Sequence, residues 1–311
     1  MSPAPERDGP KRYPPLTRAL SVAALPLAPV FGLLLSYMLF HPPRRPHHKG
    51  PRDVGLPEPE ELRVGIGGGK QVHAWLCPGD TDRIVVVGHG MGLSKSATLG
   101  HAKFLHDAGY TVCLFDHRNH GLSSQDRSVS GLSGKFTSDV LALVRLLRSR
   151  EEYRSAKVAV YGFSFSTFPM LYSLRDDDCE VNAVICDSGP GLELDPLFRN
   201  FIDAKVLPIP AALRAMPARW ALEGTLSSAG VAMLRSEWPP PVTGRYADTP
   251  LLFIAGEEDR ILPASSVDGL AARYSHAEAH VLPGIGHLQG LKEAPEKYTS
   301  TVLDFLQRAM G

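Results

Sequence analysis

The chain has 311 residues, 43% hydrophobic and 21% charged, which is enough for one large domain with a sizeable core or for two small domains. Its 33 basic and 33 acidic residues give a formal net charge of +0. Without a net charge or a basic stripe interleaved with aromatic residues, the sequence predicts no nucleic-acid partner. The cysteines Cys77, Cys113, Cys179 and Cys186 form no C-x-x-C pair, and we expect buried free thiols rather than a disulfide framework.

An apolar run follows the N-terminal tail of residues 1–18. Residues 19–40, ALSVAALPLAPVFGLLLSYMLF, carry no charge and would span about 33 Å as a helix, enough to cross a bilayer core. Pro26 and Pro29 would kink this helix without preventing it from spanning. We expect a transmembrane anchor, with a cleaved secretory signal as the alternative. The run is long for a signal, and SYMLFHPP lacks a small-x-small cleavage pattern.

The charges around the apolar run leave its orientation open. Four basic residues lie on each side of it: Arg7, Lys11, Arg12 and Arg18 before it, and Arg44, Arg45, Lys49 and Arg52 after it. The positive-inside rule therefore favours neither orientation. A short tail before a large C-terminal domain mildly favours an extracytoplasmic domain.

A proline-rich stretch, residues 41–60, comes next. Its six prolines predict a semi-extended spacer rather than a folded element. His41, His47 and His48 lie in it without a set of cysteines or carboxylates at ligand spacing, so we interpret them as solvated rather than metal-binding.

Residues 61–311 predict an α/β domain. Residues 61–78 resemble two strands joined by a glycine-rich turn, and Val64 and Gln71 stand where a phosphate-binding loop would need other residues. Strand candidates then alternate with helix candidates. The strands are residues 83–89, 110–116, 157–163, 181–187, 250–256 and 277–283; the helices are residues 95–109, 133–150, 164–176, 265–275 and 294–310. The strands are continuous β-branched runs, which indicates a mostly parallel sheet with helices on both faces.

The alternation stops over residues 188–248. Prolines interrupt weakly helical stretches there, and the segment is too long for an ordinary connection. We expect a helical lid over the carboxyl ends of the strands, where ligands bind in such sheets.

The residues just after the strands suggest nucleophilic catalysis. GFSFS places Ser164 at a tight strand-to-helix turn, Asp259 follows the strand ending at Gly256, and His287 lies in a glycine-flanked loop after the last strand. A serine needs an imidazole base and an orienting carboxylate to become a nucleophile. The N–H groups of Met91, in GHGMG, and of Phe165 could stabilise an oxyanion. At this point Ser164 or Ser166 could still be merely a helix cap.

These motifs resemble those of the α/β-hydrolase superfamily, close to its membrane-anchored monoacylglycerol-lipase-like and serine-aminopeptidase-like hydrolases. The resemblance rests on HGM at 89–91, FDHRNHGLS at 115–123, GFSFS around Ser164, GEEDRILP around Asp259 and GIGH ending at His287. It implies an α/β-hydrolase fold over residues 61–311, with Ser164 as nucleophile, His287 as base, Asp259 as acid and Met91 and Phe165 as the oxyanion hole. Two positions depart from the pattern: Ser166 replaces the usual second Gly, and Asn119 replaces a common Gly in DHRGHG.

Other polar residues at strand ends have weaker claims. Asp187 is an alternative acid, in CDSGPG. Glu257 and Glu258 are expected to face solvent. Asp116, Arg118, His120 and His89 are expected to stabilise turns rather than to take part in chemistry.

The function expected from these features is hydrolysis of a carboxylic ester through an acyl-enzyme, without a metal or organic cofactor. A small or lipid-like acyl compound would be the substrate. A peptidase or thioesterase using the same triad is the alternative within this chemistry. A catalytically inactive, membrane-tethered binding protein on the same fold is the alternative of another class.

Overall fold

The computed structural model describes residues 13–44, 47, 49–178, 180–204 and 207–311. Most of the expected N-terminal tail, together with His48 and Cys179, therefore lies outside the described residues. The described cysteines, Cys77, Cys113 and Cys186, are buried free thiols, as expected.

One eight-stranded mixed sheet forms the centre of the molecule, in the order β1-β2-β4-β3-β5-β6-β7-β8. Its strands are β1 (Glu60–Gly65), β2 (Gln71–Cys77), β3 (Asp80–Gly88), β4 (Tyr110–Phe115), β5 (Lys157–Phe163), β6 (Ala183–Asp187), β7 (Leu251–Gly256) and β8 (Ala277–Leu282). β2 pairs antiparallel with both β1 and β4, and the remaining pairs are parallel. The predicted α/β sheet and its N-terminal hairpin are therefore confirmed.

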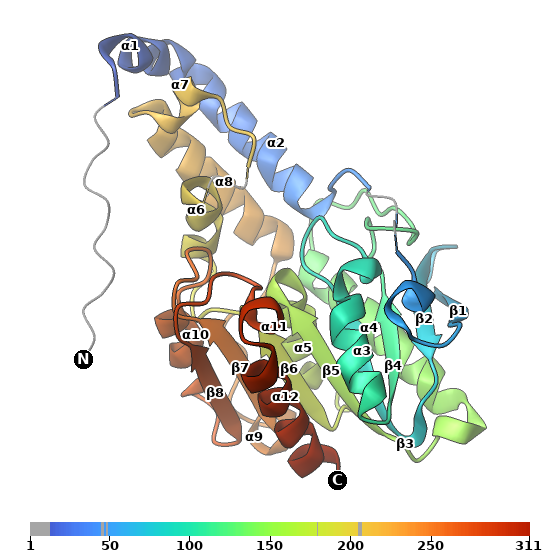
Figure 1. Cartoon of the computed structure of the whole chain (residues 1–311). Coiled ribbons are helices and arrows are strands. Elements are labelled where there is room, and N and C mark those ends of the chain that lie inside the picture. The colour runs from blue at the N-terminus through green and yellow to red at the C-terminus, as the bar shows by residue number, and fades with distance from the viewer. Residues whose placement is uncertain (1–12, 45–46, 48, 179, 205–206) are drawn as a thin grey trace.

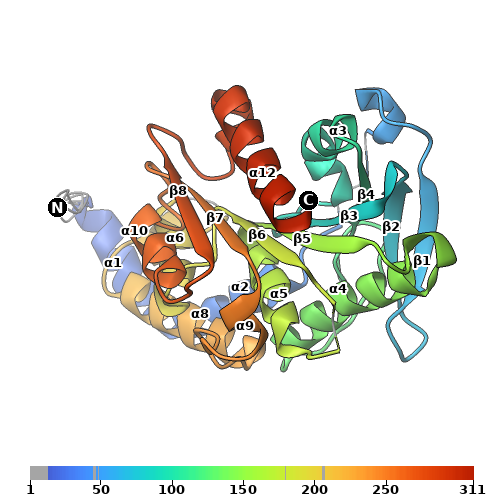
Figure 2. The ribbon, with the colours of Figure 1, turned by 90° about the horizontal axis from the view of Figure 1, so that it is seen from below.

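Helices cover both faces of the sheet (Figures 1 and 2). α3 (Leu99–Asp107) and α12 (Pro295–Met310) pack on one face, in a core cluster that includes Leu105 and Phe305. α4 (Leu132–Ser149), α5 (Thr167–Tyr172) and α10 (Ala264–Ala271) pack on the other, in a cluster that includes Val140 and Leu171. Buried on both faces, β4 and β7 have no exposed residue, which explains their unbroken apolar sequence.

A cap of helices lies above the carboxyl ends of the strands (Figure 1). It consists of α6 (Asp195–Asp203), α7 (Ala211–Arg214) and α8 (Ala218–Leu234), and α9 (Arg245–Asp248) leads back to β7. The expected lid at residues 188–248 is thus helical. Its longest helix, α8, runs through most of the segment between Pro217 and Pro239.

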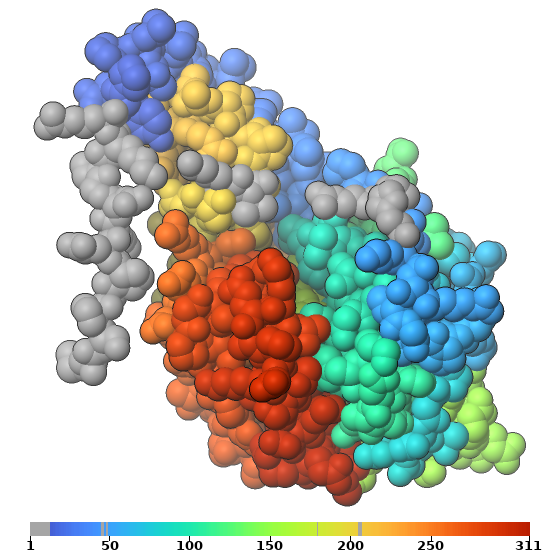
Figure 3. Space-filling model, in the orientation of Figure 1, coloured from blue at the N-terminus to red at the C-terminus, as the bar shows by residue number. Residues whose placement is uncertain are grey.

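The apolar run forms one bent helix over Pro15–Phe40, long and apolar enough to cross a membrane. It consists of α1 (Pro15–Ala24), the 3₁₀ turn η1 (Leu25–Leu27) and α2 (Ala28–Phe40), with the prolines at the bend. The helix lies along α7 and α8 of the cap, and Figure 3 shows it packed against them above the body of the molecule. An anchor separate from the hydrolase domain was expected, whereas here the helix is part of the cap.

The stretch expected to be a free spacer, residues 41–60, instead contacts the domain. It includes the 3₁₀ turn η2 (Pro51–Val54), and Leu56 is buried. His47 Nδ1 bonds to Ser94 Oγ at 3.1 Å, and its ring lies against Trp75. The interpretation of His41 and His47 as solvated was therefore wrong for both: the His41 ring stacks on Tyr37 at the end of α2.

Candidate active site

Ser164 lies at the tip of a tight turn between β5 and α5. Its φ of 50° lies in the left-handed region, which residues other than glycine seldom adopt and which is common at reactive sites. Gly162 makes the turn possible, because a Cβ at that position would lie 2.6 Å from the backbone of Ser166 and Thr167. The side chain of Ser164 is thereby turned toward the cap.

Ser166 does more than provide the small side chain that the sequence suggested. Its hydroxyl accepts the N–H of Phe163 at 2.7 Å and donates to the carbonyl of Gly88 at 2.8 Å. The residue is completely buried. It therefore fastens the turn to the end of β3, a role that glycine could not fill.

The structure brings Ser164, His287 and Asp259 together from three separate strand ends. His287 Nε2 lies 3.0 Å from Ser164 Oγ, and His287 Nδ1 lies 2.7 Å from Asp259 Oδ2. The second carboxylate oxygen of Asp259 accepts the N–H groups of Ile261 and Leu262 at 2.8 and 2.9 Å. A carboxylate oriented in this way holds the imidazole with Nδ1 protonated and Nε2 facing the serine.

Met91 and Phe165 lie beside Ser164 and line the same cleft. The N–H of Met91 has no hydrogen-bond partner among the described residues. Phe165 is the second residue of the 3₁₀ turn η5 (Ser164–Ser166), and the first N–H groups of a helix have no partner within it. Two free donors thus stand where a developing negative charge could be stabilised.

Buried histidines support the loop that carries Met91. His120 Nε2 accepts the N–H of Gly92 at 3.1 Å, and its Nδ1–H donates to the carbonyl of Arg118. Burial lowers the pKa of His120 to about 3, so its ring is neutral and can accept. His89 similarly donates to the carbonyl of Gly90. Both histidines thus make the turn-stabilising contacts expected of them.

Charged residues after β4 form buried ion pairs rather than a second site. Asp116 pairs with Lys95 at 2.7 Å, and both side chains are almost fully buried. Arg118 bonds to Asp126 and Asp139. Among the described residues, no group of three potential ligands could hold a metal ion.

Asp187, the alternative acid, makes its hydrogen bonds in a network of hydroxyl groups, whereas His287 bonds to Asp259. It accepts hydrogen bonds from Tyr298 and from Ser188, and Tyr298 also bonds to Tyr161. Burial raises the pKa of Asp187 to about 6. Ser188 in turn accepts the N–H of Leu288, next to His287, so the network supports the histidine loop.

A narrow cleft, partly open to solvent, lies above Ser164. Apolar side chains from the cap and the strand ends line most of it, including Phe198, Phe201, Leu234 and Leu262. Phe40, from the end of the N-terminal helix, also lines it. Its apolar lining could receive a hydrocarbon chain, and Phe40 is a lining residue that the sequence analysis did not find.

Comparisons with known proteins agree with this architecture. Residues 79–231 match the family model described as serine aminopeptidase, S33. The uncharacterized protein YqkD of Bacillus subtilis is 24% identical over 74% of this chain and 73% of its own length. An uncharacterized Mycobacterium tuberculosis protein is also 24% identical, over 75% of this chain and 73% of its own.

Two solved structures illustrate the shared fold. An esterase of Pyrococcus furiosus superposes with a TM-score of 0.71 at 22% identity, covering 87% of this chain and 98% of the esterase. A membrane phospholipase A described as a bacterial virulence factor superposes with a TM-score of 0.59 at 18% identity, covering 94% of this chain and 96% of its own. Together with the sheet order and the turn at Ser164, these matches show that the chain has the α/β-hydrolase fold and that residues 79–231 are similar to the serine aminopeptidase family.

Proposed function

We propose that the protein is a serine hydrolase that cleaves carboxylic esters. The observation that carries the proposal is the continuous hydrogen-bond chain from Ser164 through His287 to Asp259, whose two links are 3.0 and 2.7 Å. These hydrogen bonds let the oriented imidazole accept the proton of the Ser164 hydroxyl. An alcohol needs such a base to act as a nucleophile.

The reaction would proceed in two acyl transfers. Ser164 Oγ attacks the ester carbonyl carbon while its proton passes to His287 Nε2, and Asp259 stabilises the imidazolium. The N–H groups of Met91 and Phe165 bind the resulting oxyanion. When the tetrahedral intermediate collapses, the alcohol leaves with the proton of His287, and the acyl group stays on Ser164. Water, deprotonated by His287, then releases the carboxylic acid and restores the serine.

The lining of the cleft favours an apolar acyl group. Phe168, Leu197 and Phe198 offer dispersion contacts and no hydrogen-bonding side chains to a substrate. Proteins of similar structure include esterases and a membrane phospholipase A, which are named for the same class of bond.

A peptidase that uses the same residues is the second candidate. Among the described residues that line the cleft, Glu193 alone carries a carboxylate, and it is exposed. A carboxylate at this edge could bind the protonated amino terminus of a peptide, and the matching family model is named for aminopeptidases.

A fluorophosphonate probe tests the proposal on the full-length chain in mild detergent. We expect labelling of the wild type and none of Ser164→Ala. A folded wild type that stays unlabelled would favour the non-catalytic binding protein. Kinetics with p-nitrophenyl esters and with aminoacyl-nitroanilides then separate an esterase from an aminopeptidase, with Glu193→Gln as the variant expected to affect the second class of substrate.

We also propose that the N-terminal helix holds the protein at a membrane. Its outer face exposes large apolar side chains to half or more of their area: Leu16, Leu20, Val22, Leu27, Val30, Leu33 and Leu34. An apolar surface of this extent marks a contact with lipid or protein. Membrane fractionation with Leu33→Glu/Leu34→Glu as the comparison variant tests the contact. Protease protection of intact cells reports the side of the membrane on which the domain lies, which we expect to be extracytoplasmic.

A further inference from the structure

The end of the N-terminal helix reaches the active-site cleft. Phe40, the last residue of α2, is only 1% exposed, although the outer face of the same helix is open. Its ring centroid lies 6.2 Å from that of Phe165, the residue after Ser164, in an edge-to-face arrangement. It lines the cleft together with Ser164 and Met91. A side chain of the N-terminal helix is therefore a neighbour of the reacting groups.

The helix is fixed against the cap along its length. A Cβ on Gly32 would lie 2.9 Å from the side chain of Thr225, so glycine permits the close approach of α2 to α8. Ser36 donates to the carbonyl of Leu226 at 3.0 Å, and Ser21 donates to the carbonyl of Ala215 at 2.7 Å. Such contacts define both the register and the rotation of the helix, and with them the position of Phe40.

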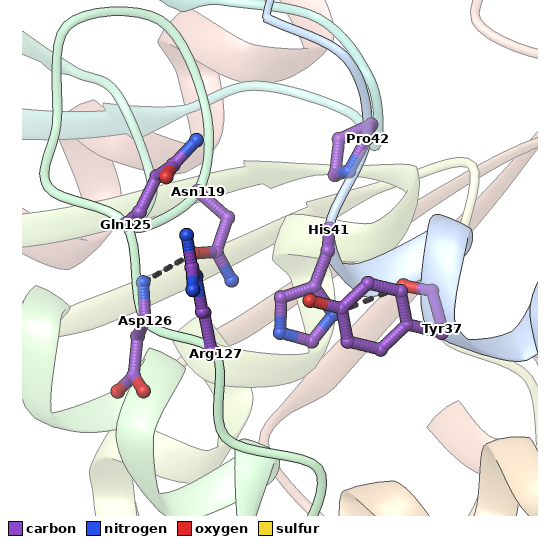
Figure 4. A pocket seen from close by; sticks show the side chains of 7 residues that line it. All are labelled: Tyr37, His41, Pro42, Asn119, Gln125, Asp126 and Arg127. Carbon is purple, nitrogen blue, oxygen red and sulfur yellow. Dashed lines mark hydrogen bonds between the residues drawn. The ribbon is translucent and has the colours of Figure 1, made fainter.

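Asn119 fastens the end of the helix to the domain. Its Nδ2 donates to the carbonyl of Phe40 at 3.0 Å, and its Oδ1 accepts the N–H of Asp126 at 2.6 Å. Figure 4 shows Asn119 facing the end of α2, beside a pocket that Tyr37 and His41 also line. The last carbonyls of a helix have no partner within it, so this bond satisfies one of them.

The backbone of Asn119 has a φ of 69°, a conformation that glycine adopts without strain and asparagine tolerates. A glycine at this position would fit the turn but could not reach the helix. Asn119, which stands where the DHRGHG pattern has glycine, thus gives up an unstrained backbone for a side chain that bonds to α2.

We propose that the N-terminal helix is a wall of the active-site cleft, in which Phe40 limits the length of the acyl chain and Asn119 is the positioning residue that holds Phe40 in place. The inference rests on the proposed ester hydrolysis. Removing the Phe40 ring should open the cleft toward α2 and allow longer chains. Removing the Asn119 side chain, which frees the end of α2, should likewise allow longer acyl chains.

The first test compares Phe40→Ala with the control Phe104→Ala, since Phe104 lies in α3 and packs against the core cluster that α3 and α12 share, outside the cleft. The full chain in detergent is assayed with p-nitrophenyl esters from acetyl to dodecanoyl. For Phe40→Ala, the ratio of kcat/KM for the longest to the shortest ester should rise about tenfold or more, and for Phe104→Ala it should stay as in the wild type. Should Phe40→Ala fail to fold, Phe40→Leu should show a smaller rise.

Fluorophosphonate labelling separates this inference from the proposed function. A wild type that cannot be labelled refutes the proposed function itself. If the wild type and Phe40→Ala are both labelled while the ester ratio stays unchanged, the role of Phe40 is refuted and the hydrolase stands.

The second test is Asn119→Gly, which relieves backbone strain and removes only the side-chain bonds. We expect faster amide hydrogen exchange in residues 28–40 and the same shift toward longer esters. Unchanged exchange together with an unchanged ester ratio would overturn the role of Asn119.

Discussion

The hydroxyl of Ser166 provides a sharp test of how the turn at Ser164 is held. The substitution Ser166→Ala removes this hydroxyl, which bonds to two backbone groups, and keeps the Cβ. The side chain remains small, so Ser164 should stay at the tip of the turn and the variant should still be labelled by a fluorophosphonate. Ser166→Val should lose labelling, because Ser166 is completely buried and the two added methyl groups would press on the backbone groups that its hydroxyl now contacts.

Ser166→Ala should lower the free energy of unfolding, because two buried backbone groups lose their bond to the hydroxyl. Without it, the buried N–H of Phe163 has no acceptor, and a buried donor left unpaired costs about 1–3 kcal/mol. The carbonyl of Gly88 loses a donor as well. Ser173→Ala is the matched control: Ser173 is equally buried, but its hydroxyl donates only to the carbonyl of Met170, which also accepts a backbone N–H. We expect that control to lose about 0.5–1.5 kcal/mol.

Urea unfolding of the two variants, followed by circular dichroism, measures the difference. The free energy of unfolding should fall by about 1–2 kcal/mol more for Ser166→Ala than for Ser173→Ala, with similar dependence on urea. Equal losses in both variants would show that the bonds of Ser166 add nothing beyond its size, and the interpretation from the sequence alone would then suffice.

Three further substitutions test other parts of the site. Gly162→Ala should abolish fluorophosphonate labelling with the far-ultraviolet spectrum retained, because its Cβ would overlap the backbone of the turn; a labelled variant contradicts this. Asp116→Asn leaves the buried ammonium of Lys95 unpaired and should lower the free energy of unfolding by about 3–5 kcal/mol; a loss under about 1 kcal/mol would mean that the pair is solvated. The pKa of Asp187 is raised to about 6 from 3.8, so the stability that it contributes is full below the unfolded value and is lost as the pH rises through about 6. Between pH 4 and 8 the wild type should therefore lose about 3 kcal/mol relative to Asp187→Asn in urea unfolding, and parallel curves would refute the shift.

The sheet could be predicted because its strands carry their signal locally. β4 and β5 are mostly apolar runs buried on both faces, with Thr111 near the start of β4 and the exposed Lys157 at the start of β5 as their exceptions. Ser164, Asp259 and His287 could be proposed for a similar reason: parallel strands place their carboxyl ends at one edge, so residues far apart in sequence meet there. These inferences need only the order of the elements.

The parts that the sequence did not yield depend on contacts between elements. The hydrogen bonds of the Ser166 hydroxyl and the role of Asn119 become apparent only when Gly88 and Phe40 are seen beside them. The spacer over residues 41–60 looked extended because it is rich in proline. Proline does not prevent a segment from lying on a surface, and Pro51 is in fact buried.

The N-terminal helix shows what a hydropathy pattern leaves out. Ala28, Gly32 and Ser36 recur every fourth residue and line one face, whereas Val30, Leu33 and Leu34 face outward. Small residues at this spacing allow close helix packing, so the sequence did contain a sign of a partner helix.

Cleavage after residue 40 would uncover Leu222 and Leu226 of α8, both fully buried, and would remove Phe40 from the cleft. We therefore expect the mature protein to keep this helix, with its small residues against the cap and its large residues toward lipid; a mature amino terminus beyond residue 40 would contradict both roles.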